Sequence, residues 1–123
     1  MGTILLYGYE DLPSILAIGA AAGPFQAEVL PVHAGDYLKP IGALVGRDVP
    51  GRAKPYTGGI LGNKLMVFCD LDEALNDLMA ALREAGVTPE VYKAVLTDHN
   101  QGWDVLTLMG ELKRERESFQ KKT

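Results

Sequence analysis

Four short runs of apolar residues divide this chain, and the segments between them carry helical spacing or turn residues. The runs are rich in β-branched, aromatic and aliphatic side chains, which fit the pleated surface of a strand. They are nearly continuous rather than alternating, which indicates strands that are buried on both faces of a sheet. The pattern predicts strands over residues 3–9, 26–32, 64–69 and 91–96.

Helical spacing follows each predicted strand. It is clearest after residue 70, where apolar residues recur on one helical face. These residues are Leu71, Leu75, Leu78, Met79 and Leu82. We expect the other helices over residues 12–22, 37–44 and 103–117. Short polar side chains ahead of a helix can accept hydrogen bonds from its first-turn amides. The expected caps are Asp11, Asp36, Asp70 (spaced like a capping box with Glu73) and Asn100.

The order strand, helix, strand, helix therefore occurs twice, over residues 1–46 and 64–117. The two halves are joined by residues 47–63, a segment rich in Gly and Pro that could be a linker, a loop or a short extra strand at 59–61. Strand–helix–strand connections of this length are right-handed crossovers between parallel strands. We expect one α/β domain, residues 1–123, in which two βαβα pseudo-repeats form a mostly parallel four-stranded sheet covered by helices. A ferredoxin-like α+β arrangement is the alternative.

Composition narrows the setting of the protein. Apolar residues make up 47% and charged residues 23% of the chain, which is ordinary for a soluble globular protein. The net charge of −4 gives no electrostatic support to a nucleic-acid partner. A single cysteine precludes an intrachain disulfide, which favours the reducing cytoplasm. The absence of a signal segment and of a long apolar run favours a protein that is not inserted in a membrane.

The stretch from Ala94 to Leu112 carries a resemblance to a known family. An Ala-Val-Leu-Thr strand end leads into a loop with Asn100, and Trp103 then precedes a Leu-rich helix. Together with the strand at 65–69, this pattern resembles a small bacterial family, domain of unknown function 3783, over residues 64–117. The resemblance implies no activity. It singles out Thr97, Asn100 and Trp103 and assigns them no role.

If the strands are parallel, their carboxyl ends share one edge of the sheet, where ligands of open α/β folds bind. Tyr9 and Glu10 would lie there, with both histidines and the cysteine. The sequence predicts a candidate pocket formed by His33, Cys69, Asp70, Thr97, His99, Asn100 and Trp103.

Two interpretations of this edge are open. The first is a non-catalytic cytoplasmic binding or regulatory module with an unknown small-molecule or protein partner and no cofactor. Its first helix is rich in small residues and its sheet has open edges, which favours a homodimer. The second is a small enzyme or metal-binding protein that uses His33, Cys69 and His99. No HxxxH or CxxC spacing supports a metal, and no Gly-rich turn follows Cys69 to hold an oxyanion.

Overall fold

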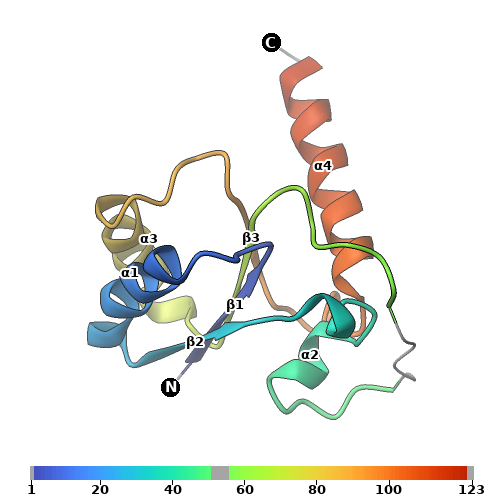
Figure 1. Cartoon of the computed structure of the whole chain (residues 1–123), viewed down its shortest axis with the longest axis horizontal. Helices are drawn as coiled ribbons and strands as arrows, with labels where there is room; N and C mark the ends of the chain where they lie inside the picture. Colours follow the sequence, from blue (N-terminus) through green and yellow to red (C-terminus); the bar gives the residue numbers. More distant parts are fainter. Residues whose placement is uncertain (1, 51–55, 122–123) are drawn as a thin grey trace. The chain divides into compact units, whose positions relative to one another are not determined.

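The computed structural model describes residues 2–50 and 56–121, which form four strands and four α-helices (Figure 1). The strands are β1 (Gly2–Tyr7), β2 (Ala27–Pro31), β3 (Leu65–Cys69) and β4 (Tyr92–Val95). The helices are α1 (Leu12–Ala22), α2 (Ile41–Leu44), α3 (Leu75–Glu84) and α4 (Val105–Lys121). Each predicted strand is present, with bounds that differ by at most two residues.

The chain divides into two compact units. The sheet unit comprises the ranges Met1–His33 and Gly59–Leu96, and therefore holds all four strands with α1 and α3. The second unit comprises Ala34–Gly58 and Thr97–Thr123, with α2 and α4. Each predicted repeat thus contributes its strand–helix–strand part to the sheet unit. That the halves arose by duplication, and that the chain is one domain, stay predictions.

The sheet has the order β2-β1-β3-β4. The pairs β1/β2 and β3/β4 are parallel, and the central pair β1/β3 is antiparallel. Each helical crossover joins two neighbouring parallel strands, whereas the split arrangement of a ferredoxin-like fold would insert a strand between them. The expected α/β class and mostly parallel sheet are confirmed.

The expectation that all four strands end on one edge is wrong. In the central pair, Thr3 lies opposite Cys69 and Tyr7 lies opposite Leu65. The carboxyl ends of β1 and β2 therefore lie at one edge of the sheet, and those of β3 and β4 at the other. The crossover rule fixes strand direction within each half. It does not determine how the two halves pair. Here the first strands of the two halves, β1 and β3, lie side by side and antiparallel.

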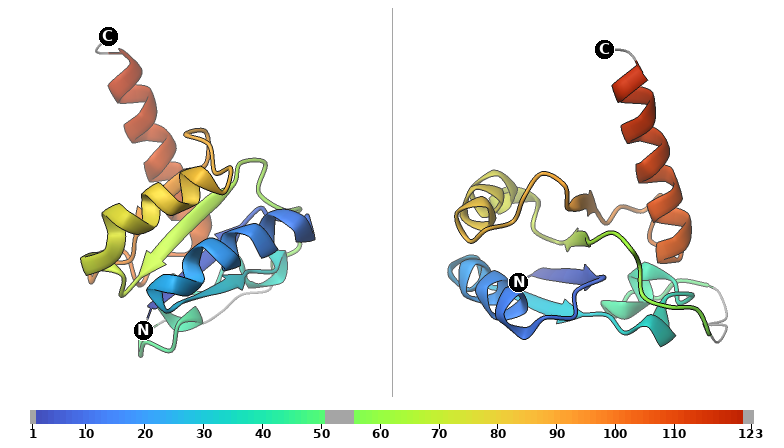
Figure 2. Two further views of the ribbon diagram at one scale, coloured as in Figure 1. Left: turned by 90° about the vertical axis from the view of Figure 1, so that its left-hand side faces the viewer. Right: turned by 45° about the horizontal axis from the view of Figure 1, so that its top comes forward.

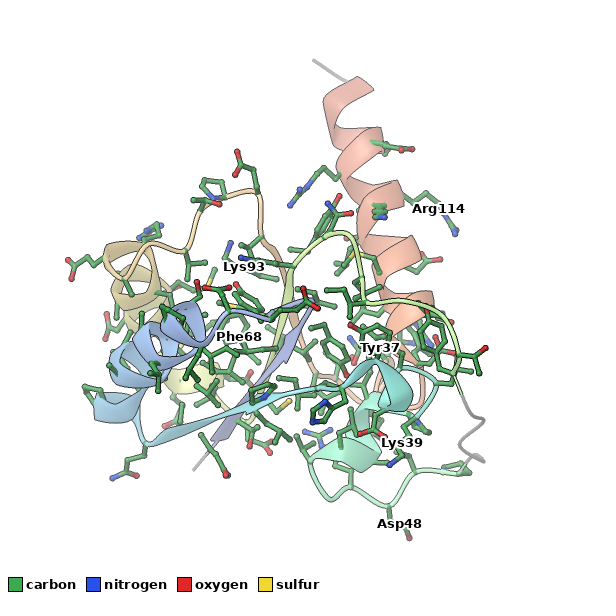
Figure 3. The ribbon with its side chains drawn as sticks, in the orientation of Figure 1. Tyr37, Lys39, Asp48, Phe68, Lys93 and Arg114 are labelled. Atoms are coloured by element: carbon green, nitrogen blue, oxygen red, sulfur yellow. The ribbon has the colours of Figure 1, made fainter. Side chains whose placement is uncertain are left out.

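Helices α1 and α3 cover the same face of the sheet (Figure 2). Ile4 and Leu6 of β1, with Met66 and Phe68 of β3, point into this layer, and Figure 3 shows Phe68 on the side that faces α1. The helices contribute the buried residues Ile18, Ala22, Leu78 and Leu82. Side chains on the opposite face are buried as well: Leu5, Tyr7, Leu65, Val67 and Cys69. Burial of both faces explains why these strands are continuous apolar runs.

One of the four expected helix caps is confirmed. Asp11 precedes α1, and its Oδ2 accepts a hydrogen bond from the Ser14 amide at 3.1 Å. Asp36 instead pairs with Lys39 at 3.0 Å, and α2 begins only at Ile41 after Pro40. Short polar residues also satisfy the backbone in turns, so a sequence signal for capping does not locate the helix start uniquely.

The caps predicted at Asp70 and Asn100 are wrong for the same reason. Asp70 adopts a left-handed φ of 59°, and α3 begins at Leu75 after the 3-10 turn Asp72–Ala74. Asn100 lies in a turn before α4. The residue that caps α4 is Asp104, whose Oδ1 accepts from the Thr107 amide at 2.8 Å.

The segment after β1 and the segment before β3 approach closely. Gly8 has a φ of +80°, and a Cβ at this position would lie 2.9 Å from the Asn63 carbonyl oxygen. Only glycine suits both the left-handed backbone and the contact. No strand forms at 59–61, whereas residues 51–55 of the predicted loop lie outside the described residues. Gly8 therefore permits residues 61–63 to lie against the end of β1.

In the second unit, residues 37–42 are bonded to the turn that precedes α4. The amides of Ile41 and Gly42 donate to the carbonyls of Trp103 and Gln101, each at 2.8 Å. Arg47 Nη1 also donates to Gln101 Oε1 at 2.9 Å. Within the described ranges, none of the helices is both long enough and apolar enough to cross a bilayer.

Candidate ligand-binding cavity

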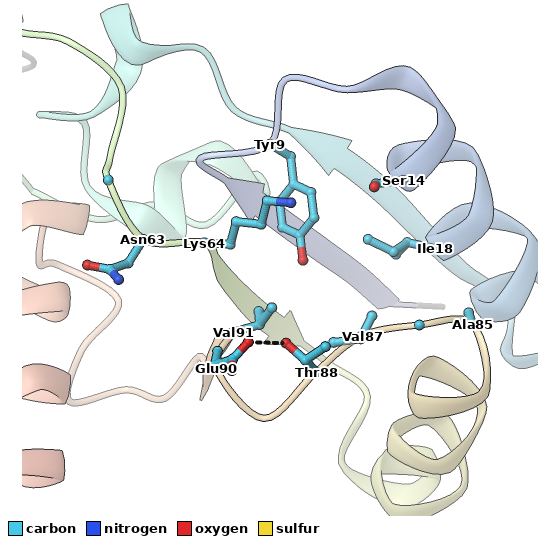
Figure 4. A pocket seen from close by; sticks show the side chains of 12 residues that line it. Tyr9, Ser14, Ile18, Asn63, Lys64, Ala85, Val87, Thr88, Glu90 and Val91 are labelled. Carbon is cyan, nitrogen blue, oxygen red and sulfur yellow. Dashed lines mark hydrogen bonds between the residues drawn. The ribbon is translucent and has the colours of Figure 1, made fainter.

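A cavity of about 370 Å³ opens in the sheet unit, at the edge where β1 ends and β3 and β4 begin (Figure 4). The antiparallel central pair creates this location, because it brings the end of one half next to the start of the other. The lining residues are Tyr9, Ser14, Ile18, Gly62, Asn63, Lys64, Ala85, Gly86, Val87, Thr88, Glu90 and Val91. All of them belong to the sheet unit.

Tyr9 and Lys64 form one side of the cavity. The Lys64 ammonium lies 4.8 Å from the centroid of the Tyr9 ring and 3.9 Å from Asp11 Oδ1. In Figure 4 the Tyr9 hydroxyl points away from Lys64, toward the Val87–Val91 segment. Burial, and secondarily the nearby charge of Asp11, raise the pKa of Tyr9 to about 12. The hydroxyl is therefore protonated at neutral pH and can donate a hydrogen bond.

Asp11, the partner of Lys64, does not itself line the cavity and is held as a carboxylate. The hydrogen bond from the Ser14 side chain is the largest cause that lowers the pKa of Asp11, and the Ser14 amide and Lys64 add to it. The Lys64 and Asp11 side chains are 44% and 50% exposed, so this ion pair is screened by solvent and contributes little to stability. For the cavity, the pair means that the positive charge of Lys64 is partly balanced by the Asp11 carboxylate.

The opposite side of the cavity is the connection from α3 to β4. Gly86 adopts a φ of +103° after α3, a left-handed conformation that suits a glycine at the end of a helix. The Thr88 hydroxyl donates to Glu90 Oε2 at 3.1 Å. Lys93 Nζ donates to the carbonyls of Thr88 and Val91 at 3.3 and 3.0 Å. These bonds fix the position of the hydroxyl and the carboxylate at this side.

Apolar side chains form one part of this open cavity, and polar groups make up nearly as much of its surface. Ile18, Val87 and Val91 are buried and face the space, and Ser14 contributes a hydroxyl from α1. A concave apolar surface with a small number of convergent polar groups is the usual form of a small-molecule site. The arrangement can hold and orient a small ligand.

The structure does not bring the predicted pocket residues of the sheet unit together. His33 is exposed and follows β2, at the edge where β1 ends. Cys69 is buried at the end of β3, opposite Thr3 and hence at the other edge. Antiparallel pairing of β1 with β3 separates these two residues by the length of the sheet. The enzyme or metal-binding interpretation required these two residues to converge with His99, and the structure does not bring His33 and Cys69 together.

Asp70 lies beside a second cavity of about 330 Å³ at that other edge. The cavity also contacts Gly2, Phe25 and the acidic turn Asp72–Ala74. Cys69 Sγ, next in the chain, lies 3.8 Å from the Val67 carbonyl oxygen and can donate to it within the core. Among the residues that the structure places, no three His, Cys, Asp or Glu side chains gather as a metal site would require.

The other four predicted residues lie together in one turn of the second unit. The amide of Thr97 donates to Asn100 Oδ1 at 2.8 Å, and the amide of Asn100 donates to Thr97 Oγ1 at 3.2 Å. The His99 ring meets the Trp103 ring edge-on, with centroids 5.2 Å apart. The contacts give Thr97 and Asn100 a structural role. Whether these residues also bind a partner stays a prediction.

Sequence reasoning placed Tyr9 at a strand end but missed Lys64, Thr88 and Glu90. These three residues precede β3 or β4, whereas the predicted pocket was drawn from the residues that follow the carboxyl ends of strands. The one signal was the Gly-rich stretch before Lys64, which is typical of a close backbone approach.

Residues 64–119 match the model of a protein family described as Domain of unknown function (DUF3783). The match confirms the resemblance expected over residues 64–117. It contains the Lys64 and Thr88–Val91 part of the cavity, whereas Tyr9, Ser14 and Ile18 lie outside it. No curated protein and no solved structure matches the chain.

Proposed function

We propose that the protein is a non-catalytic cytoplasmic module that binds a small molecule in the cavity between Tyr9 and Thr88. The observation that carries the proposal is a cavity in which the buried apolar side chains of Ile18, Val87 and Val91 lie beside the hydroxyl-bearing residues Tyr9, Ser14 and Thr88. Its volume of about 370 Å³ lies within the range of small-molecule sites, roughly 300–1,000 Å³. The chain's single cysteine, buried in the core, supports the reducing compartment.

A fragment titration followed by amide chemical shifts tests this function. The library would contain small rings with hydroxyl, amide, amine and carboxylate head groups. We expect saturable shifts at Gly86, Thr88 and Val91 with at least one fragment. Ser14→Phe would place a ring in the cavity and abolish them. Ala17→Phe, at an exposed position of the same helix that does not line the cavity, is the matched control and should retain them.

Two results would contradict the proposal. A library in which no fragment shifts the lining amides would remove the cavity as a binding site. Shifts that persist unchanged in Ser14→Phe would place the binding elsewhere on the protein.

We also propose that α1 mediates self-association. Leu12 and Leu16 are 63% and 62% exposed, and α1 contains no charged residue from Leu12 to Ala22. A two-fold contact brings the same surface of two copies together, so charged faces repel whereas an uncharged apolar face does not. Gly19 and Ala20 lie in the same helix, and the absence of large side chains at these positions permits a close approach of the second copy.

Sedimentation analysis over a concentration series tests the second proposal. We expect a dimer that dissociates on dilution, and Leu12→Glu or Leu16→Glu should shift it to monomer. Leu106→Glu changes an exposed leucine of α4 and should leave the equilibrium unchanged. A wild-type protein that is monomeric at every concentration would disprove self-association.

A further inference from the structure

The charges at the cavity bear on the kind of ligand that fits it. Lys64 lies between the Tyr9 ring and the Asp11 carboxylate, and Glu90 accepts a hydrogen bond from Thr88. The cation and the anion at the cavity thus each have a neighbour within the protein. Neither charge therefore depends on an oppositely charged ligand for a partner.

The polar groups that face the interior are suited to an uncharged ligand. Tyr9 presents a hydroxyl above the apolar surface of Ile18 and Val91 (Figure 4). The negative charge of Asp11 lies near that hydroxyl and, after burial, is the second cause of the raised pKa of Tyr9, so it works against an anion there. Lys64 above the ring works against a cation. A neutral ligand whose oxygen accepts a hydrogen bond is repelled by neither the Asp11 carboxylate nor the Lys64 ammonium.

We propose that the cavity takes a small uncharged alcohol or amide with a compact apolar body, whose oxygen accepts a hydrogen bond from the Tyr9 hydroxyl. The apolar body occupies the space between Ile18, Val87 and Val91. The Thr88 hydroxyl, which donates to Glu90, retains lone pairs that accept a hydrogen bond from an alcohol or amide donor. This assignment rests on the proposed binding function and names the class of ligand.

Three probes of the same shape and different charge test the assignment: cyclohexanol, cyclohexylammonium and cyclohexanecarboxylate. Each is titrated at neutral pH while the amide shifts of Gly86, Thr88 and Val91 are followed. We expect cyclohexanol to saturate these shifts, with the two charged probes about tenfold weaker or more. Tyr9→Phe removes the hydroxyl alone and should weaken cyclohexanol about five- to tenfold, the worth of one hydrogen bond. Tyr56→Phe, in the second unit, is the matched control and should leave its affinity unchanged.

The outcomes separate the two proposals. A charged probe that binds at the cavity as tightly as cyclohexanol overturns the neutral class and leaves small-molecule binding in place. Unchanged cyclohexanol affinity in Tyr9→Phe overturns the assigned hydrogen bond. A cavity whose amides respond to none of the three probes and to no fragment overturns the ligand class and the binding function together.

Discussion

Thr97 and Asn100 each satisfy the other's backbone amide with a side-chain oxygen, at 2.8 and 3.2 Å. The pair closes the turn that leaves β4 and positions the backbone that precedes α4. Trp103, three residues further on, accepts the Ile41 amide through its carbonyl and contacts His99 through its ring. The three residues that the family resemblance singles out therefore have a shared structural role in this turn.

Removal of either oxygen should destabilise the turn. We expect Asn100→Ala and Thr97→Val to lower the free energy of unfolding by about 1–2 kcal/mol each, because each leaves one amide without its acceptor. Urea denaturation of the two single variants and the double variant measures the coupling. Since the two bonds close one turn, the double variant should lose less than the sum of the single losses. Strictly additive losses would argue against a cooperative pair.

Asp104 should be the residue whose loss weakens α4. Its Oδ1 accepts from the Thr107 amide, so Asp104→Ala should cost about 1 kcal/mol of stability. Asp104→Asn keeps an acceptor oxygen and is the matched control, with a loss of only a few tenths. Thermal unfolding of both variants provides the comparison. If the two variants unfolded at the same temperature, the hydrogen bond from the Thr107 amide to Asp104 would contribute no stability.

The raised pKa of Tyr9 predicts a loss of stability in alkaline solution. The unfolded chain releases the Tyr9 proton near its ordinary pKa of 10, whereas the folded chain retains it to about 12. Stability from this group is therefore fully present below pH 10 and is lost as the pH rises toward 12. Denaturant unfolding across this window should show a shallower decline for Tyr9→Phe than for the wild type. An identical decline in both proteins would mean that Tyr9 has no raised pKa.

Substitution of Gly8 should disturb the cavity from outside it. Gly8→Ala places a side chain on a left-handed backbone and 2.9 Å from the Asn63 oxygen, so we expect a loss of about 1–3 kcal/mol. The displacement of residues 61–63 should also move Lys64 and weaken fragment binding. Gly59→Ala has open space and should be close to neutral in both measurements. If Gly8→Ala destabilised the protein but fragments bound with full affinity, the contact between Gly8 and Asn63 would not affect the cavity.

The nearly continuous apolar runs determined the strands, and the spacing of Leu71 to Leu82 predicted an amphipathic helix, of which Leu75–Glu84 is α-helical. These signals are local, because a buried strand and an amphipathic helix each need their own periodicity of side chains. The cap at Asp11 was also predictable from the sequence, since it acts on the helix directly after it. The caps at Asp36, Asp70 and Asn100 were misassigned because the same side chains stabilise turns.

The sequence by itself determined the α/β class, the four strands and the parallel pairing within each half. Only the tertiary structure decided that β1 and β3 run in opposite directions, because no local pattern specifies how two strands from distant halves pair. The antiparallel pairing of β1 with β3 places His33 and Cys69 at opposite edges of the sheet. It also brings Tyr9 beside Lys64 and Thr88, so the cavity is a consequence of the pairing of the two halves.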